Sequence, residues 1–232
     1  MIVFLPLATW FTISLFGTNK TQELSVSEQP LKFFFLGLFL ACFYAFFEVL
    51  FIQSLTYRQT RNSIILNTLL LFCFDYFLPS AILFLLVFFG SKKSYEQRMT
   101  NLFSFMAGFY SVYMVYSSLL RYEKTSAFFI FVKPILIFCF IFMFSQGMVA
   151  FFNLLKKEKE SEKFVSKISL AVLFLVISSI VPPLIQAMYV TGKSLTIRII
   201  LTILYVFLFS VFFCIRYKSF STSSTSFSED LI

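Results

Sequence analysis

The chain has 232 residues, of which 59% are hydrophobic and 21% aromatic, while only 13% are charged. A soluble domain averages about 45–50% apolar and about 25% charged residues, so this composition excludes an ordinary water-soluble domain and indicates a chain whose solvent is lipid. The formal net charge is +8. Because the lysines and arginines fall mostly in short segments between apolar runs, the charge is typical of membrane loops, and we expect no nucleic acid as a partner of the residues present.

The apolar runs, taken in chain order, predict an all-α fold: a polytopic transmembrane helix bundle with seven spans, or six if the first run does not span. The first run, Ile2–Gly17, reaches only ~24 Å as a helix, short of the ~30 Å hydrocarbon core, so it is either a thinly anchored span or an interfacial helix. The predicted spans are residues 2–17, 31–55, 64–89, 102–120, 127–152, 168–190 and 195–215. Residues 1–218 form a single predicted domain, and we expect the Ser/Thr-rich tail, residues 219–232, to be disordered.

The orientation follows from the segment Asn153–Lys167, NLLKKEKESEKFVSK, the most densely charged run of the chain. A lysine-rich loop between two apolar spans is hard to translocate and marks the cytoplasmic side. Alternating sides from this loop places twelve Lys and Arg residues on the cytoplasmic side and seven on the other. We therefore expect a multi-pass protein of the bacterial inner membrane with a cytoplasmic C-terminus.

Three charged residues lie inside the predicted spans: Glu48, Asp75 and Lys133. Each costs roughly 2.5–3.5 kcal/mol at a helix centre on insertion scales, so such residues mark sites or pairs. Their positions put all three in the half of the membrane opposite to the charged loop. They could neutralise one another, or they could line a cavity that is open to the outside.

Other polar groups share this outer half. Tyr110, Tyr113 and Tyr116 recur every three residues on one helix face. Gln186 follows Pro182-Pro183, two prolines that should kink or break their helix and free backbone carbonyls. The sequence thus predicts a ligand-binding pocket in the outer half of the bundle, formed by Glu48, Asp75, Tyr113, Tyr116, Lys133 and Gln186. The alternative interpretation is structural: a Lys–acid pair joining two helices, a Lys133 side chain that reaches the interface, and an interfacial belt of tyrosines.

Gly37, Ala41 and Ala45 are spaced by four residues, and small residues at that period let two helices approach closely. This face is predicted to pack inside the bundle or against a partner membrane subunit or a second copy.

The sequence lacks several residues and motifs that enzymes and metal sites commonly use. The chain has no histidine, which removes Ser-His hydrolases, His-ligated metals and haem. The four cysteines lie inside apolar runs without a CxxC pair, so we predict small apolar side chains and no zinc site. The sequence has neither a P-loop nor a Gly-x-Ser-x-Gly motif. We therefore predict a non-enzymatic protein that needs no cofactor and no metal.

Two short segments carry a resemblance to a known family. The turn Tyr57–Asn62, YRQTRN, and the ending Phe227–Ile232, FSEDLI, resemble parts of multi-spanning bacterial regulators in which a membrane sensor domain precedes a LuxR-type helix-turn-helix. The likeness covers about a dozen residues. The resemblance implies that the chain is the sensor half alone or a truncated copy, with DNA binding assigned to no residue present.

Two functions fit these features. A membrane-embedded sensor or receptor-like domain is favoured by the outer polar cluster and by the resemblance. A membrane subunit of a transporter, either a permease or an integral substrate-binding subunit, is favoured by the size of the chain and by the small-residue face.

Overall fold

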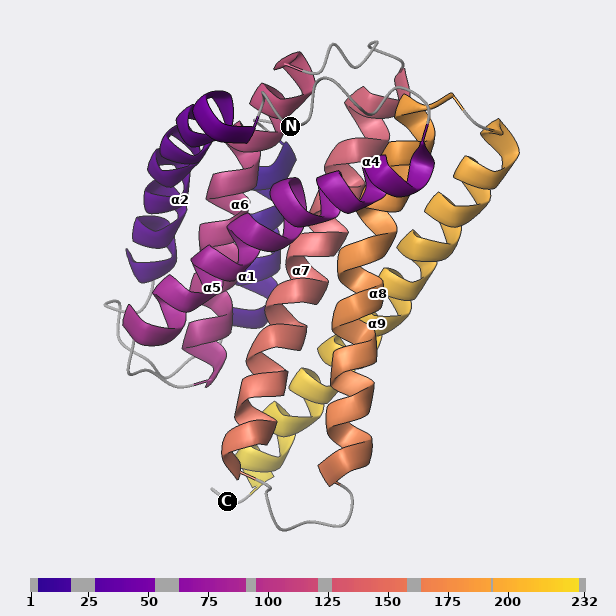
Figure 1. The fold of residues 1–232 in the computed structure, drawn as a ribbon. Helices are drawn as coiled ribbons and strands as arrows, with labels where there is room; N and C mark the ends of the chain where they lie inside the picture. Colours follow the sequence, from indigo (N-terminus) through magenta and orange to yellow (C-terminus); the bar gives the residue numbers. More distant parts are fainter. Residues whose placement is uncertain are drawn as a thin grey trace.

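The computed structural model of the chain describes residues 4–17, 28–52, 63–90, 95–120, 127–157, 164–192 and 194–229. Nearly all of these residues are helical and none of them lies in a strand. The all-α fold class is therefore confirmed for the described part of the chain. Most helices run along a common direction, and the segment containing α4 and α5 crosses obliquely over α6 and α7 (Figure 1).

Each apolar run forms one helix or a continuous series of helical segments. Two of the runs contain a π-helical turn, in which the backbone hydrogen bonds shift to a wider register. The elements are α1 (Phe4–Gly17), α2 (Glu28–Phe47) with η2 (Glu48–Ile52), α4 (Ile64–Leu70) with η3 (Leu71–Phe77) and α5 (Leu78–Gly90), α6 (Tyr95–Leu120), α7 (Ala127–Lys157), α8 (Phe164–Val190) and α9 (Leu195–Glu229).

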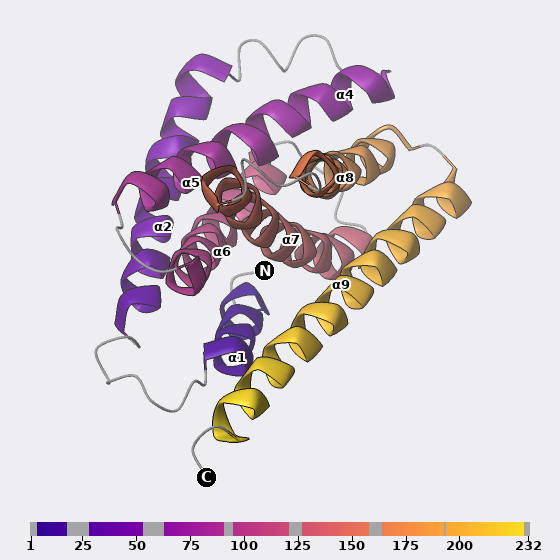
Figure 2. The same cartoon turned by 90° about the horizontal axis from the view of Figure 1, so that it is seen from below.

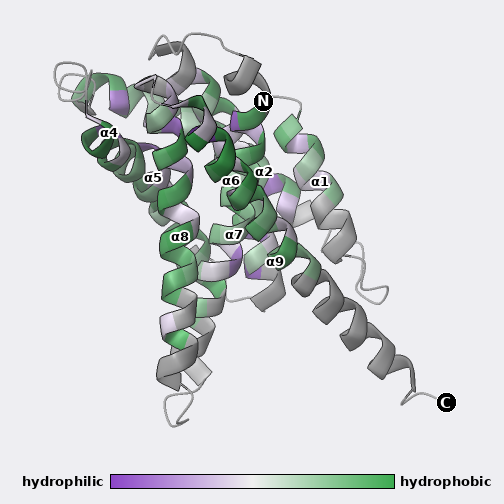
Figure 3. Cartoon of the chain, turned by 90° about the vertical axis from the view of Figure 1, so that its right-hand side faces the viewer, coloured by the Kyte–Doolittle hydropathy of each residue, from purple (hydrophilic) through white to green (hydrophobic). Residues whose placement is uncertain are grey.

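Five of these helical runs are long and apolar enough to cross a membrane. They are Pro30–Phe51, Ile64–Phe89, Val132–Val149, Val172–Tyr189 and Leu195–Cys214. The green of hydrophobic residues predominates along the coloured parts of the ribbon in Figure 3. Helices α1 and α6 do not meet the same criterion of length and composition: α1 has 14 residues, and α6 carries many tyrosines and serines. The described residues thus support a multi-pass membrane protein, and the count of seven spans stays a prediction.

Helix α6 forms the centre of the bundle. Every residue from Asn101 to Ser111 is buried, and α6 packs against α1, α2, α5 and α7. Seen from below, α6 and α7 lie between α2 on one side and α9 on the other (Figure 2). Because α6 is enclosed by other helices, it can carry polar side chains that a lipid-facing helix could not.

The closest helix contact joins α2 and α6, which run parallel. A Cβ added to Gly37 would collide with the carbonyl oxygen of Phe105 and would lie 2.8 Å from the Phe109 nitrogen. From the other side, a Cβ on Gly108 would collide with the carbonyl oxygen of Phe34. The two helix backbones therefore touch at reciprocal glycines, and any larger residue at either position must push them apart.

The predicted small-residue face lies along this contact. Gly37 is buried, and Ala41 and Ala45 are 0% and 9% exposed. In the described structure this face packs inside the bundle, on α6.

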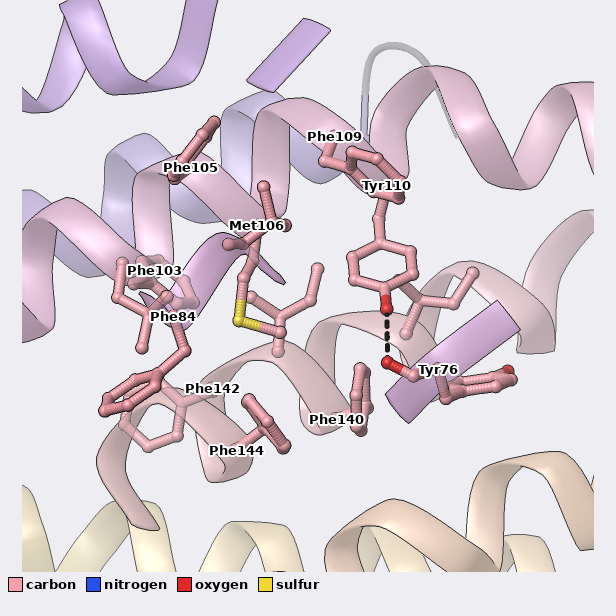
Figure 4. Packing of buried hydrophobic residues seen from close by; sticks show 14 of the residues in the cluster. Tyr76, Phe84, Phe103, Phe105, Met106, Phe109, Tyr110, Phe140, Phe142 and Phe144 are labelled. Atoms are coloured by element: carbon pink, nitrogen blue, oxygen red, sulfur yellow. Dashed lines mark hydrogen bonds between the residues drawn. The ribbon is translucent and has the colours of Figure 1, made fainter. Parts of the chain in front are cut away.

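Aromatic rings fill the space between α6 and its neighbours. Phe109 packs on Tyr44 of α2 with ring centroids 5.6 Å apart, and Phe140 of α7 packs edge-on against Tyr76 and Tyr110 at 5.0 and 5.8 Å. Figure 4 shows this layer, with Tyr110 pointing from α6 toward Tyr76. Edge-to-face ring pairs fix the relative rotation of the helices that carry them.

Two expectations concern the ends and the continuity of helices. The backbone is helical through Glu229, and no Gly or Pro interrupts residues 195–229; the disorder expected of the tail from residue 219 stays a prediction. A kink or a break is expected at Pro182-Pro183, and helix α8 is continuous there, so the break is absent. The helices also reach further than predicted: α6 begins at Tyr95 rather than at residue 102, and α7 and α8 extend to Lys157 and back to Phe164. Only residues 158–163 of the charged loop lie outside the described residues.

Candidate polar site in the membrane core

The two acidic residues of the predicted pocket both lie at π-helical turns. Glu48 is the first residue of η2, and Asp75 lies inside η3. Their exposed fractions are 5% and 0%. A π-helical turn inserts an extra residue into a helix and re-aims the side chains around it, and such turns are frequent at functional sites.

Tyr113 of α6 connects these two acids. Its hydroxyl lies 2.8 Å from Oε2 of Glu48 and 3.2 Å from Oδ1 of Asp75. The two carboxyl oxygens are therefore at most about 6 Å apart, close enough for two charges in a buried setting to influence each other strongly. A phenol has one hydrogen to donate, so it can fully satisfy one of the two carboxyls at a time. The site joins α2, the α4–α5 segment and α6 at one oxygen atom.

A second group of tyrosines donates to the backbone beside Asp75. Pro79 has no N–H, so it cannot donate to the Asp75 carbonyl four residues earlier, as in an α-helix, or to the Phe74 carbonyl five residues earlier, as in a π-helix. The Tyr44 hydroxyl donates to the Phe74 carbonyl at 2.6 Å, and the Tyr110 hydroxyl lies 3.1 Å from the Asp75 carbonyl.

Tyr110 has two further contacts that fix its hydroxyl. It lies 3.0 Å from the Tyr76 carbonyl, the bond drawn as a dashed line in Figure 4, and 2.8 Å from the Ser80 hydroxyl. If Ser80 donates to Tyr110, the phenol hydrogen stays free for the carbonyls of η3. These bonds satisfy polar backbone groups that could not be left unpaired at membrane depth.

Helix α8 joins the cluster through Tyr76 of η3, whose hydroxyl donates to Oε1 of Gln186 at 3.0 Å. Gln186 is 3% exposed. The double proline one turn earlier obeys the same rule as Pro79: Pro182 removes the donor for the Ser178 carbonyl, and the Tyr205 hydroxyl of α9 donates to it at 3.1 Å. This bond satisfies the carbonyl that Pro182 frees, one of the two carbonyls that lose a donor at the double proline.

Lys133 and Tyr116 complete the predicted set. Lys133 is 2% exposed, so protein encloses its side chain. It lies on α7 four residues before Ile137 and seven before Phe140, on the face that packs against Tyr76 and Tyr110. The Tyr116 hydroxyl donates to the Ala45 carbonyl at 3.2 Å, one turn before Glu48.

The structure therefore brings Glu48, Asp75 and Tyr113 into direct contact and links Gln186 through Tyr76. Lys133 is buried on α7, and the partly buried Tyr116 bonds to α2 one turn before Glu48. The sequence did not single out Tyr44, Tyr76, Tyr205 and Ser80. The available signal was a proline inside an apolar run. Such a proline indicates that a carbonyl about one turn earlier lacks its helical donor, but it does not predict which tyrosine replaces that donor.

The cluster offers two carboxyls, and among the described residues no three Cys, Asp or Glu side chains gather in a way that could hold a metal ion. The cluster is rich in acceptor oxygens: two carboxyls, phenol oxygens and the Gln186 amide oxygen are linked across η2, η3, α6 and α8. Because each of these hydrogen bonds joins two different helical elements, breaking or forming one of them can change how the helices are arranged.

Comparison of the chain with protein-family models, with curated proteins and with solved structures finds no match. The likeness to LuxR-type sensor domains therefore stays a prediction. Its first segment, Tyr57–Asn62, lies outside the described residues, as do residues 230–232 at the end of its second.

Proposed function

We propose that this protein is a membrane-embedded sensor or receptor-like domain whose responsive site is the Glu48–Tyr113–Asp75 cluster. The observation that carries the proposal is the position of the Tyr113 hydroxyl, within hydrogen-bond distance of two buried carboxyls from two π-helical turns. Ionisable residues inside a membrane bundle are costly and are usually kept for function.

The proposal links occupancy of the site to helix arrangement. The cluster cross-links α2, α4–η3–α5 and α6, so a proton or a cationic group that binds one carboxyl changes the bonds between all three. A ligand shifts a conformational equilibrium only by its differential affinity for the two states, and bonds that cross helix boundaries provide such a difference. The charge distribution predicts a cytoplasmic C-terminus. A change in helix arrangement that reaches α9 would therefore be exposed to the cytoplasm.

The test is hydrogen exchange of the purified protein in lipid nanodiscs, scanned over pH 5 to 8 and over added sodium and primary amines. The proposal expects a change in exchange around Glu48 and Asp75 in one of these series, and its loss in both Glu48→Gln and Asp75→Asn. Ser210→Ala is the matched control, since Ser210 bonds only within its own helix, to the Val206 carbonyl at 2.9 Å. Unchanged exchange throughout, or a response that survives both substitutions, contradicts the proposal.

A transport subunit is the second candidate, favoured by two buried acids that lie together at π-helical turns. Transporters place their substrate and coupling-ion sites near the bilayer midplane. Proteoliposomes separate the two functions. Net movement of a cation or amine that depends on Asp75 indicates transport, and a change in exchange without net movement indicates sensing.

The orientation has its own test. A membrane-impermeant thiol reagent added outside cells should label a cysteine placed at Thr60 and should not label one placed at Ser161. The reverse pattern would invert the proposed topology.

A further inference from the structure

Arg98, in the first turns of α6, carries a nitrogen without a partner. Its guanidinium lies 5.4 Å from the centroid of the Phe88 ring on α5. Its Nε is buried and has no hydrogen-bond partner among the described residues. A buried donor without an acceptor is costly, and a charged one more so. The described residues therefore leave this nitrogen able to take an acceptor that they do not supply.

A second buried donor lies one helical turn further on. Asn101 is 2% exposed, and its Nδ2 also lacks a partner among the described residues. Residues three apart on a helix are neighbours, with Cβ atoms ~5–6 Å apart. Both atoms are N–H donors, so each would be satisfied by an acceptor; of the two residues, Arg98 lines a pocket. The positive end of the α6 dipole favours an acceptor with negative charge there.

The surroundings of Arg98 are apolar. It lines a small pocket with Phe84, Val87 and Phe88 of α5, Leu102 of α6, and Val149 and Phe152 of α7. The pocket has a free volume of about 10 Å³, enough for one water-sized group. A whole headgroup does not fit inside, so a ligand must sit at its mouth.

Beside the pocket, α5 presents an apolar face to the surroundings. Leu85, Leu86 and Phe89 are 47%, 49% and 78% exposed. In a membrane, this face contacts acyl chains. An amphiphile with apolar tails on α5 would hold its headgroup at the level of Arg98, and Lys92 and Lys93 precede α6 in the sequence.

We propose that Arg98, at the start of α6, forms the headgroup site of an anionic phospholipid whose acyl chains lie on the exposed face of α5. The phosphate lies at the mouth of the pocket and inserts one oxygen, a group of about the size of a water molecule, toward Arg98 Nε. This site is separate from the Glu48–Tyr113–Asp75 cluster and does not depend on the function proposed for that cluster. If the charge bias sets the topology, the site lies in the cytoplasmic leaflet, where anionic lipids attract basic residues.

Arg198 of α9 provides an internal control. Its guanidinium lies 4.5 Å from the Tyr189 ring centroid, so it also stacks on an aromatic ring. Its Nε, however, donates to the Ser194 carbonyl at 3.4 Å. Two arginines of the chain thus share the ring contact and differ in whether the Nε has an acceptor.

The experiment measures the unfolding temperature of the full chain in detergent with added phosphatidylglycerol or phosphatidylcholine, and counts bound lipids by native mass spectrometry. We expect saturating phosphatidylglycerol to raise the unfolding temperature of the wild type by about 3 °C or more and phosphatidylcholine to raise it less. In Arg98→Gln, the two lipids should raise the unfolding temperature equally, and native mass spectrometry should count one fewer bound phosphatidylglycerol. Arg198→Gln should keep both.

Three results overturn the proposal: an equal response to the two lipids, an unchanged response in Arg98→Gln, or an equal loss in Arg198→Gln. Inorganic phosphate is added as a further arm, and if it alone reproduces the shift, the ligand is a free anion and the lipid assignment is wrong. Should Arg98→Gln fail to fold, Arg98→Lys replaces it. Lysine keeps the charge but lacks the guanidinium fork, and the proposal expects weaker binding of phosphatidylglycerol.

Discussion

Helices α6 and α9 occupy opposite places in the same bundle. In α6 the residues from Asn101 to Ser111 are all buried, and tyrosines and serines run along its length. In α9 only 6% of the Leu195–Cys214 window is buried, and large apolar side chains such as Ile203 and Phe207 are 62% exposed. The more polar helix is the enclosed one, as expected where lipid is the solvent and polar groups must find partners within the protein.

The difference in burial between α6 and α9 is matched by a difference in the partners of their polar side chains. On α9, Ser210 and Thr202 bond only to carbonyls of their own helix, while the buried Tyr205 reaches across to α8. On α6, Tyr110, Tyr113 and Tyr116 all bond to other elements. Polar bonds between elements are concentrated where the helix is enclosed, and that is where the candidate site lies.

The largest expected effect comes from removing a ring of α6. Phe109→Ala should lower the free energy of unfolding by about 3–5 kcal/mol, because Phe109 is 1% exposed and packs against Tyr44, Tyr110 and Tyr113. Phe207→Ala on α9 should change it by about 0.5 kcal/mol or less, since this ring is 62% exposed. Reversible unfolding in mixed micelles measures both. Similar losses in the two variants would break the comparison.

Next is the glycine contact between α2 and α6. Gly108→Ala should cost about 1–3 kcal/mol, because the added methyl group meets the Phe34 backbone, which cannot yield without moving α2. Gly147→Ala is the matched control. The Cβ there would meet the side chain of Leu175 at 2.7 Å, and a flexible side chain can move. The same unfolding assay should rank Gly108→Ala as the more damaging of the two.

A smaller effect is expected from the tyrosine hydroxyls. Tyr205→Phe should cost about 1 kcal/mol, because the Ser178 carbonyl freed by Pro182 loses its donor. Pro182→Ala restores the backbone N–H and should reduce this cost, so the double variant should be more stable than the sum of the single changes predicts. Equal costs of Tyr205→Phe in both backgrounds would show that the proline and the tyrosine are independent.

The sequence supports the fold well and the site in part. Long apolar runs predict membrane helices because lipid leaves the backbone few alternatives, and the helices follow those runs. Glu48, Asp75 and Lys133 stand out because a charge inside an apolar run is costly wherever it points. All three are at most 5% exposed in the structure.

The rest depends on contacts between distant segments. A tyrosine in an apolar run can face lipid or core, so Tyr44 and Tyr205 give no sign of the carbonyls they bond. The two π-helical turns follow no rule of local composition, although Pro79 lies just beyond one of them. The sequence left a kink and a break of α8 open for the same reason, since the donor that satisfies the Ser178 carbonyl comes from α9.

The account rests on Tyr113 coupling Glu48 and Asp75, and a double-mutant cycle measures that coupling directly. Free energies of unfolding are compared for the wild type, Tyr113→Phe, Asp75→Asn and the double variant, with Ser210→Ala in place of Asp75→Asn as the reference cycle. We expect a coupling of at least about 0.5 kcal/mol between positions 113 and 75 and additivity between 113 and 210. Additivity in both cycles would show that the phenol does not join the two carboxyls and would contradict the account.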